Sequence, residues 1–254
     1  MANVSVLEVL LYDEPIGTLT RVDGDRSLFA FNEDHIADGN RPVLGLGFKD
    51  KFGELLTEFR PYQTRVMPFF SNLLPEERLR QYLADRAGVN PEREFFLLWV
   101  LGDDLPGAIT VRPADGEEWP PDLGQTLDED AAREREEKAL RFSLAGVQLK
   151  FSAVTMATGG LTIPAKGVGG SWIVKLPSEK YDGVPENEYS MMTLARKIGM
   201  NVPALELIDV ADIGGLPQDV GAMAGKALAI ERFDRLSDGS SVHIEDFAQI
   251  FDVY

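Results

Sequence analysis

Cysteine is absent from this sequence of 254 residues, and histidine occurs only twice, at His35 and His243. The absence of cysteine excludes disulfides and thiolate metal ligands, and it fits a chain that works in a reducing cytoplasm. Two histidines so far apart in the sequence do not predict a histidine-based metal site. No apolar run approaches about 18 residues and no signal-peptide pattern opens the chain, so we expect neither a membrane span nor secretion.

Positive charge is also scarce. The chain has 25 lysines and arginines against 42 aspartates and glutamates, which gives a formal net charge of −17. A field of this sign repels nucleic acid phosphates, so we expect no direct nucleic acid binding by this chain. The simplest interpretation of the charge is solubility. A basic partner is the alternative, which charge alone does not establish.

The sequence divides into three regions that differ in composition and in predicted secondary structure. Residues 1–112 alternate strand and helix patterns and predict a compact α+β unit. The composition of residues 113–138 predicts an acidic, solvated linker, because positions 115 to 138 contain ten acidic and three basic residues. Residues 139–254 form a second unit, which contains most of the candidate site.

The elements of the first region follow from apolar spacing and turn residues. Leu79, Leu83 and Ala87 recur at helical spacing, with Pro75 expected at the first helical position and Gly88 as the stop. Period-two patterns and the remaining helical spacing predict strands over 4–12, 16–22, 27–31 and 108–111 and a second helix over 92–101.

The second unit predicts three strands, one helix and two more strands, in that order. Strand-like runs occupy 142–154 and 160–176, a helix covers 186–198, and strands cover 202–210 and 226–233. After His243 a further helix is expected to begin and to continue to the last residue. Its predicted apolar face contains Phe247, Ile250 and Phe251.

A turn rich in small residues, from Ser143 to Lys150, is the first candidate site. Small residues between two strands let backbone N–H groups approach a phosphate closely. The alternative is an ordinary hairpin that contains one glycine. The segment matches neither the Walker A pattern nor the usual GxGxxG loop, so by itself it leaves both interpretations open.

A lysine inside an apolar strand is the second candidate. Lys175 lies in a run that is apolar on both faces, and a buried ammonium costs free energy unless it meets an anion. It either holds a phosphate or extends its amine to an edge of the sheet. Glu188 on the next helix is a candidate partner, because helical spacing places it on a core-facing stripe with Met191, Leu194, Ala195 and Ile198.

The lysine and glutamate have a precedent in the protein-kinase small lobe, where a strand lysine pairs with a helix glutamate. The alternative is that Glu188 only favours the first turn of its helix. The last strand becomes charged at Glu231, which suits either a kinase hinge or a strand that leaves the core.

Taken together, these pieces resemble the HipA-like toxin kinases of bacterial toxin–antitoxin modules. The resemblance covers nearly the whole chain in the correct order. The segments that carry it are FFSNLLPE (69–76), GDDLPGA (102–108), FSLAGVQLK (142–150), WIVKLP (172–177), ENEY (186–189), ERFDR (231–235) and EDFAQ (245–249).

The resemblance implies a fold and a set of roles. The fold is α+β: a HipA-type N-terminal subdomain is followed by a kinase-like small lobe, an antiparallel sheet with one packed helix, while the large lobe is mostly absent. The implied ATP-binding residues are Ala145, Gly146, Val147, Gln148, Lys175, Glu231, Phe233 and Asp234. Glu188 would pair with Lys175, and Ser143 would be the autophosphorylated serine whose phosphate acts as an off switch.

The family's activity is transfer of the ATP γ-phosphate to a protein serine or threonine, with Mg²⁺. That chemistry needs an aspartate, an asparagine and a second metal-binding aspartate, whereas the last asparagine here is Asn201. We therefore assign no catalytic residue and no metal ligand, and we expect a truncated kinase that is inactive alone. The resemblance implies bacterial cytoplasm, a helix-turn-helix antitoxin (HipB-like) as partner and an aminoacyl-tRNA synthetase as substrate. The alternative is a non-catalytic module that docks an antitoxin or a separate kinase core.

Overall fold

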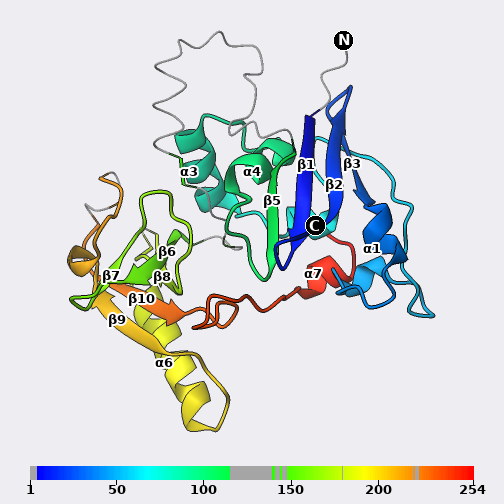
Figure 1. Cartoon of the computed structure of the whole chain (residues 1–254). Coiled ribbons are helices and arrows are strands. Elements are labelled where there is room, and N and C mark those ends of the chain that lie inside the picture. The colour runs from blue at the N-terminus through cyan, green and yellow to red at the C-terminus, as the bar shows by residue number, and fades with distance from the viewer. Residues whose placement is uncertain are drawn as a thin grey trace.

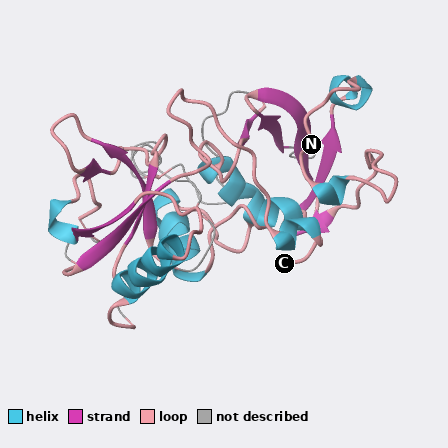
Figure 2. Ribbon diagram, turned by 90° about the horizontal axis from the view of Figure 1, so that it is seen from below, coloured by secondary structure: helices cyan, strands magenta, loops and turns pink. Residues whose placement is uncertain are grey.

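A computed structural model describes residues 5–114, 139–140, 144, 148–178, 180–218, 220 and 223–254. In this part of the chain the strands form two five-stranded sheets, and every strand pair within them is antiparallel. The two sheets lie side by side, and helices pack against each of them (Figures 1 and 2). The expected α+β architecture is confirmed.

The first sheet has the order β4-β3-β2-β1-β5. Its strands are β1 (Ser5–Leu11), β2 (Glu14–Val22), β3 (Arg26–Phe31), β4 (Tyr62–Gln63) and β5 (Ile109–Pro113). Its helices are α1 (Glu33–Ala37), the 3₁₀ turn η1 (Leu46–Phe48), α2 (Pro68–Ser71), α3 (Glu77–Ala87) and α4 (Glu94–Leu101). The last of these, α4, is buried along its entire length, so it forms the centre of this unit.

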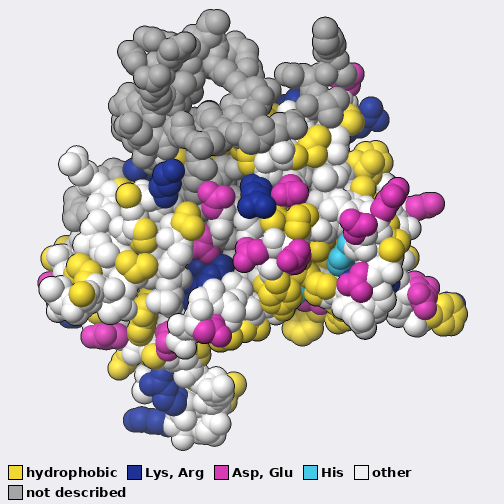
Figure 3. Space-filling model, viewed as in Figure 1, with side chains coloured by type: hydrophobic (Ala, Val, Ile, Leu, Met, Phe, Trp, Pro, Cys, Tyr) yellow, Lys and Arg dark blue, Asp and Glu magenta, His cyan; other side chains and the backbone are white. Residues whose placement is uncertain are grey.

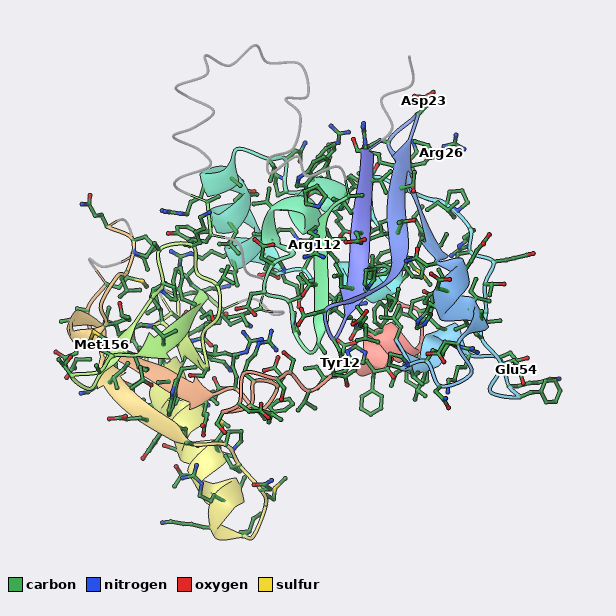
Figure 4. All side chains as sticks on the ribbon, viewed as in Figure 1. Tyr12, Asp23, Arg26, Glu54, Arg112 and Met156 are labelled. Carbon is green, nitrogen blue, oxygen red and sulfur yellow. The ribbon has the colours of Figure 1, made fainter. Side chains whose placement is uncertain are left out.

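Two residues with positive φ make the tight hairpin between β1 and β2. Tyr12 and Asp13 have φ values of 55° and 64°, and the returning strand resumes at Glu14. Positive φ at both central positions matches the right-handed twist of the strands that the turn joins. Figure 4 labels Tyr12 at this end of the sheet, beside the C-terminal segment. Its ring meets His243 edge-on, with centroids 6.4 Å apart.

The second sheet has the order β7-β6-β8-β10-β9. Its strands are β6 (Lys150–Thr155), β7 (Leu161–Thr162), β8 (Trp172–Lys175), β9 (Leu205–Asp209) and β10 (Lys226–Glu231). The long helix α6 (Val184–Lys197) precedes β9 and contacts β9 and β10, and the 3₁₀ turn η2 (Val210–Asp212) follows β9. This is the expected antiparallel sheet with one packed helix.

The C-terminal segment returns to the first unit after β10. The short helix α7 (Phe247–Ile250) contacts α2 and η1. A capping box at Asp246 and Gln249 begins this helix. The Gln249 amide also donates to Phe69 O at 3.0 Å, and the Tyr254 hydroxyl donates to Val66 O at 2.9 Å. The C-terminal end of the second unit is therefore tied to the first unit.

Three local expectations are wrong. Pro75 is not the first helical residue, because α3 begins at Glu77, two positions later. The final helix ends at Ile250 rather than continuing to residue 254, and its neighbours Phe247 and Phe251 are 76% and 69% exposed. Of that predicted apolar face, only Ile250 is partly buried.

The third wrong expectation is the core-facing stripe of α6. Met191, Leu194 and Ile198 are 58%, 52% and 71% exposed. Helical spacing identifies which residues share a face, but it does not say whether another element covers that face.

The surface agrees with the composition. Acidic side chains spread over the face shown in Figure 3, among hydrophobic side chains that remain exposed. No helix in the described part of the chain is both long enough and apolar enough to span a bilayer.

Candidate functional site

Lys175 and Glu188 form an ion pair between β8 and α6. The ammonium at the end of β8 donates to Glu188 Oε1, and the two side chains are 22% and 30% exposed. Helix α6 begins after Gly183, whose left-handed conformation turns the chain, and Pro185 occupies its first turn. The pair therefore depends on where α6 starts, and not on the apolar stripe that the spacing predicted.

Lys150 adds a second ammonium beside this pair. It begins β6 and is the direct register partner of Lys175, so both side chains leave the same face of the sheet. Lys150 is 8% exposed. Burial, reinforced by the Lys175 charge, lowers the pKa of Lys150 to about 8, although Glu76 and Glu188 act in the opposite direction. The sequence reasoning missed this neighbour because strand register cannot be read from the motif.

The small-residue turn is described only at its edges. Gln148 donates from Nε2 to Leu176 O at 2.8 Å, and Leu176 N–H donates to Leu149 O at 2.9 Å. These bonds fix the end of the turn next to β8, one residue beyond Lys175. Ser143, Ala145, Gly146 and Val147, all candidates from the sequence, lie outside the described residues.

Two candidate residues of the expected hinge end β10 and follow it. β10 lies beside β8, with Leu228 opposite Lys175, so this strand continues along the same site. The N–H of Glu231 donates to Ala204 O at 2.8 Å. Within the described residues, Phe233 N–H has no acceptor, and Phe233 is 62% exposed. The backbone at Phe233 is therefore available to an external ligand.

Asp234 lies inside the protein. Its carboxylate accepts from Arg232 Nε at 3.0 Å and Nη2 at 2.8 Å, from Arg235 Nη1 at 3.0 Å and from Gly107 N–H at 2.9 Å. Burial raises the pKa of Asp234, but the hydrogen bonds and charges of the two arginines outweigh it and hold that pKa below its ordinary value. A ribose would have to share oxygens that already accept from the protein.

The arrangement suits an anion. Lys150 and Lys175 place two ammonium groups on one face, with Glu188 as the partner of Lys175. Within the described residues no group of three or more histidines, aspartates and glutamates could hold a metal ion. The site can therefore neutralise phosphate charge with its own side chains, and no metal ligand is assigned to it.

Two family models match the chain in sequence. A model described as the HipA N-terminal domain matches residues 7–112, and one described as the HipA-like C-terminal domain matches residues 142–254. The first covers the first sheet from within β1 through α4 and most of β5. The second covers the described part of the second sheet and the returning C-terminal segment.

Two curated relatives of this chain carry names that describe kinases. "Putative kinase Y4dM" of Sinorhizobium fredii is 61% identical over 256 residues, which cover 100% of this chain and 61% of that protein. "Serine/threonine-protein kinase toxin HipA" of Shewanella oneidensis is 31% identical over 182 residues, or 67% of this chain and 38% of that protein. The chain spans about three fifths of the length of the first of these relatives.

A solved structure shares the fold. HipA of Shewanella oneidensis MR-1, in a complex with HipB and operator DNA, superposes with a TM-score of 0.60 at 26% identity. The match covers 97% of this chain and 56% of that one.

Proposed function

This chain belongs to the HipA-like family, and from that premise we propose that its second sheet is the nucleotide-binding lobe of a protein serine/threonine kinase. The observation that carries the proposal is the ion pair between Lys175 and Glu188, which joins β8 to α6. In kinases a strand lysine paired with a helix glutamate holds the nucleotide phosphates. A second lysine, Lys150, stands opposite Lys175 and adds to the positive charge of the same face.

Each candidate residue has a role in this proposal. Lys175 binds phosphate, and Glu188 orients its amine. The backbone of Ala145, Gly146, Val147 and Gln148 covers the phosphates, with Gln148 pinned to Leu176. The backbone of Glu231 and Phe233 meets adenine, for which the N–H of Phe233 is available. A ribose contact by Asp234 would share oxygens that already accept from Arg232 and Arg235. Phosphate on Ser143 would add about −1.5 to −2 charges beside the ATP phosphates and repel them.

Nucleotide binding is assigned to these residues, but phosphotransfer is not. Transfer of the γ-phosphate needs an aspartate that orients the substrate hydroxyl and an asparagine and aspartate that hold Mg²⁺. No asparagine follows Asn201 in the sequence. The protein substrate, an aminoacyl-tRNA synthetase by analogy with the family, therefore belongs to the proposal for the whole kinase and not to this segment alone.

Titration with a fluorescent ATP analogue tests the proposal. Glu188→Gln removes the charge that orients Lys175 and should weaken binding about tenfold or more, the size of one lost charge-assisted hydrogen bond. Glu186→Gln is the matched control, because Glu186 is exposed in the same helical turn and should leave affinity within twofold. No saturable binding by the wild-type chain, or equal losses in both variants, would contradict the proposal.

A second function, docking of a protein partner, is favoured by the exposed apolar face of α6. Met191, Leu194 and Ile198 are all more than half exposed on one helix, and such faces mark interaction surfaces. The related HipA of Shewanella oneidensis is solved with HipB and operator DNA. We propose a helix-turn-helix antitoxin of this type as the partner. Leu194→Glu should abolish co-purification with the antitoxin, and retained binding would count against this face.

A further inference from the structure

Asp104 of the first unit lies at the centre of a buried ionic cluster that includes residues of the second unit. Its side chain, in the loop between α4 and β5, is 3% exposed. Asp104 Oδ1 accepts from Arg232 Nη1 at 2.9 Å and from Arg235 Nη2 at 2.8 Å. Both arginines follow β10, which is the strand that leads into the proposed hinge. One carboxylate oxygen of the first unit therefore holds both flanks of Phe233.

The second oxygen of Asp104 reaches another part of the second sheet. Asp104 Oδ2 accepts from Gly169 N–H at 3.1 Å and from the Ser152 hydroxyl at 3.4 Å. Gly170 N–H donates to the same hydroxyl at 3.1 Å. These contacts fix the turn before β8 against β6. Asp104 thus collects donors from three segments of the second unit that are far apart in sequence.

The cluster continues to the backbone of the hinge. Arg232 N–H donates to Ser171 O at 2.8 Å, so the residue before Phe233 is held by both its backbone and its side chain. The guanidinium of Arg232 is 1% exposed and is shared by Asp104 and Asp234. Arg235 also donates to Leu105 O at 2.8 Å and to Gly107 O at 2.7 Å. The position of the Phe233 N–H is therefore set from both sides.

We propose that Asp104 is a positioning residue for the adenine end of the nucleotide site. The inference rests on the proposed function, because it assigns the Phe233 backbone to the base. A buried ion pair is weak evidence for stability, since desolvation offsets much of its attraction. What the cluster does provide is a fixed geometry, because one carboxylate accepts from four donors on three segments. The first unit thereby becomes part of the nucleotide site.

The test compares Asp104→Asn with Asp34→Asn in the full chain. Both variants lose one negative charge in the first unit, but Asp34 is exposed. Affinity is measured for ATP and for inorganic tripolyphosphate, which lacks the base. We expect Asp104→Asn to weaken ATP about tenfold or more and tripolyphosphate less than twofold, while Asp34→Asn changes neither. Unchanged ATP affinity, or equal losses for both ligands, would overturn the inference.

Arg235→Lys provides a milder variant if Asp104→Asn does not fold. Arg235 is 18% exposed, and lysine keeps its charge but cannot reach Asp104 and Leu105 together. It should weaken ATP about threefold and leave tripolyphosphate unchanged; a loss for both ligands contradicts base positioning.

Hydrogen exchange separates this inference from the proposed function. If the wild-type chain binds no nucleotide, the proposed function fails, while amide exchange in residues 165–171 and 226–236 still reports on the cluster. Faster exchange confined to these two segments in Asp104→Asn supports positioning by Asp104. A uniform increase over the chain, or none, overturns it.

Discussion

Lys150 and Lys175 stand directly opposite each other on β6 and β8, so two ammonium groups share one face of the second sheet. Like charges in such a pair repel, and burial of Lys150 adds a desolvation cost. Lys175 pairs with Glu188, and Glu76 and Glu188 offset part of the positive charge around Lys150. Burial and the Lys175 charge outweigh this offset, so Lys150 lowers the stability of the folded chain.

Lys150→Met should therefore stabilise the chain at pH 7. The folded pKa of Lys150 is about 8, below its ordinary value of 10.5, so the unfolded chain binds more protons between these values. The penalty is fully present below about pH 8 and is relieved as the pH rises toward 10.5. We expect a gain of roughly 1–3 kcal/mol at pH 7 that shrinks at pH 9.5. Urea unfolding at both pH values measures it.

The control for this variant is Lys166→Met, since Lys166 is exposed. It should change the free energy of unfolding by less than about 0.5 kcal/mol at either pH. A Lys150→Met protein that is less stable than wild type at pH 7, or equally shifted at both pH values, would contradict the account of the lysine pair.

Gly170→Ala should damage the turn before β8 through sterics alone. A Cβ at Gly170 would lie 2.2 Å from Ser152 Oγ and 2.5 Å from Ala153 N. Overpacking of this kind costs roughly 1–3 kcal/mol. Gly39→Ala is the matched control, because a Cβ there meets nothing within 4 Å. Thermal unfolding should separate the two variants, and equal melting temperatures would show that β6 and the turn can move apart.

Glu94→Gln should destabilise the first unit. Glu94 is 1% exposed and accepts from Val66 N–H at 3.0 Å, Ser71 Oγ at 2.9 Å and Arg80 Nη1 at 3.1 Å. The amide replaces one acceptor with a donor and leaves a buried group unsatisfied, at roughly 2–3 kcal/mol. Glu92→Gln, exposed two residues earlier, should be neutral. Equal unfolding free energies for both variants would indicate that water replaces the lost acceptor.

Part of the fold and one contact of the candidate site could be predicted from the local sequence. The strands β1 to β3 and the helix α4 were predicted within two residues, because apolar period and turn residues fix them locally. The pairing of Lys175 with Glu188 was also predicted, from helical spacing and from the lysine–glutamate pair of the kinase small lobe. Both depend on contacts over short stretches of chain.

The rest depends on long-range contacts that no local pattern encodes. Asp104 and Arg232 are 128 positions apart in the chain, yet they form a buried ion pair. Lys150 meets Lys175 through strand register, which is set by the whole sheet. The apolar stripe of α6 shows the opposite error. Helical spacing predicted that this stripe packs against the core, but it is exposed in the described part of the chain. The candidate residues Ser143, Ala145, Gly146 and Val147 lie outside the described part.

The central claim is that Lys175 holds a nucleotide phosphate, and isothermal calorimetry with ATP tests it most directly. The wild-type chain should bind ATP weakly, above about 1 μM, and Lys175→Ala should weaken it at least about tenfold, as expected for a lost charge-assisted contact. Lys166→Ala, an exposed lysine that precedes β8, should leave the affinity unchanged. Equal ATP affinity in wild type and Lys175→Ala would contradict the account.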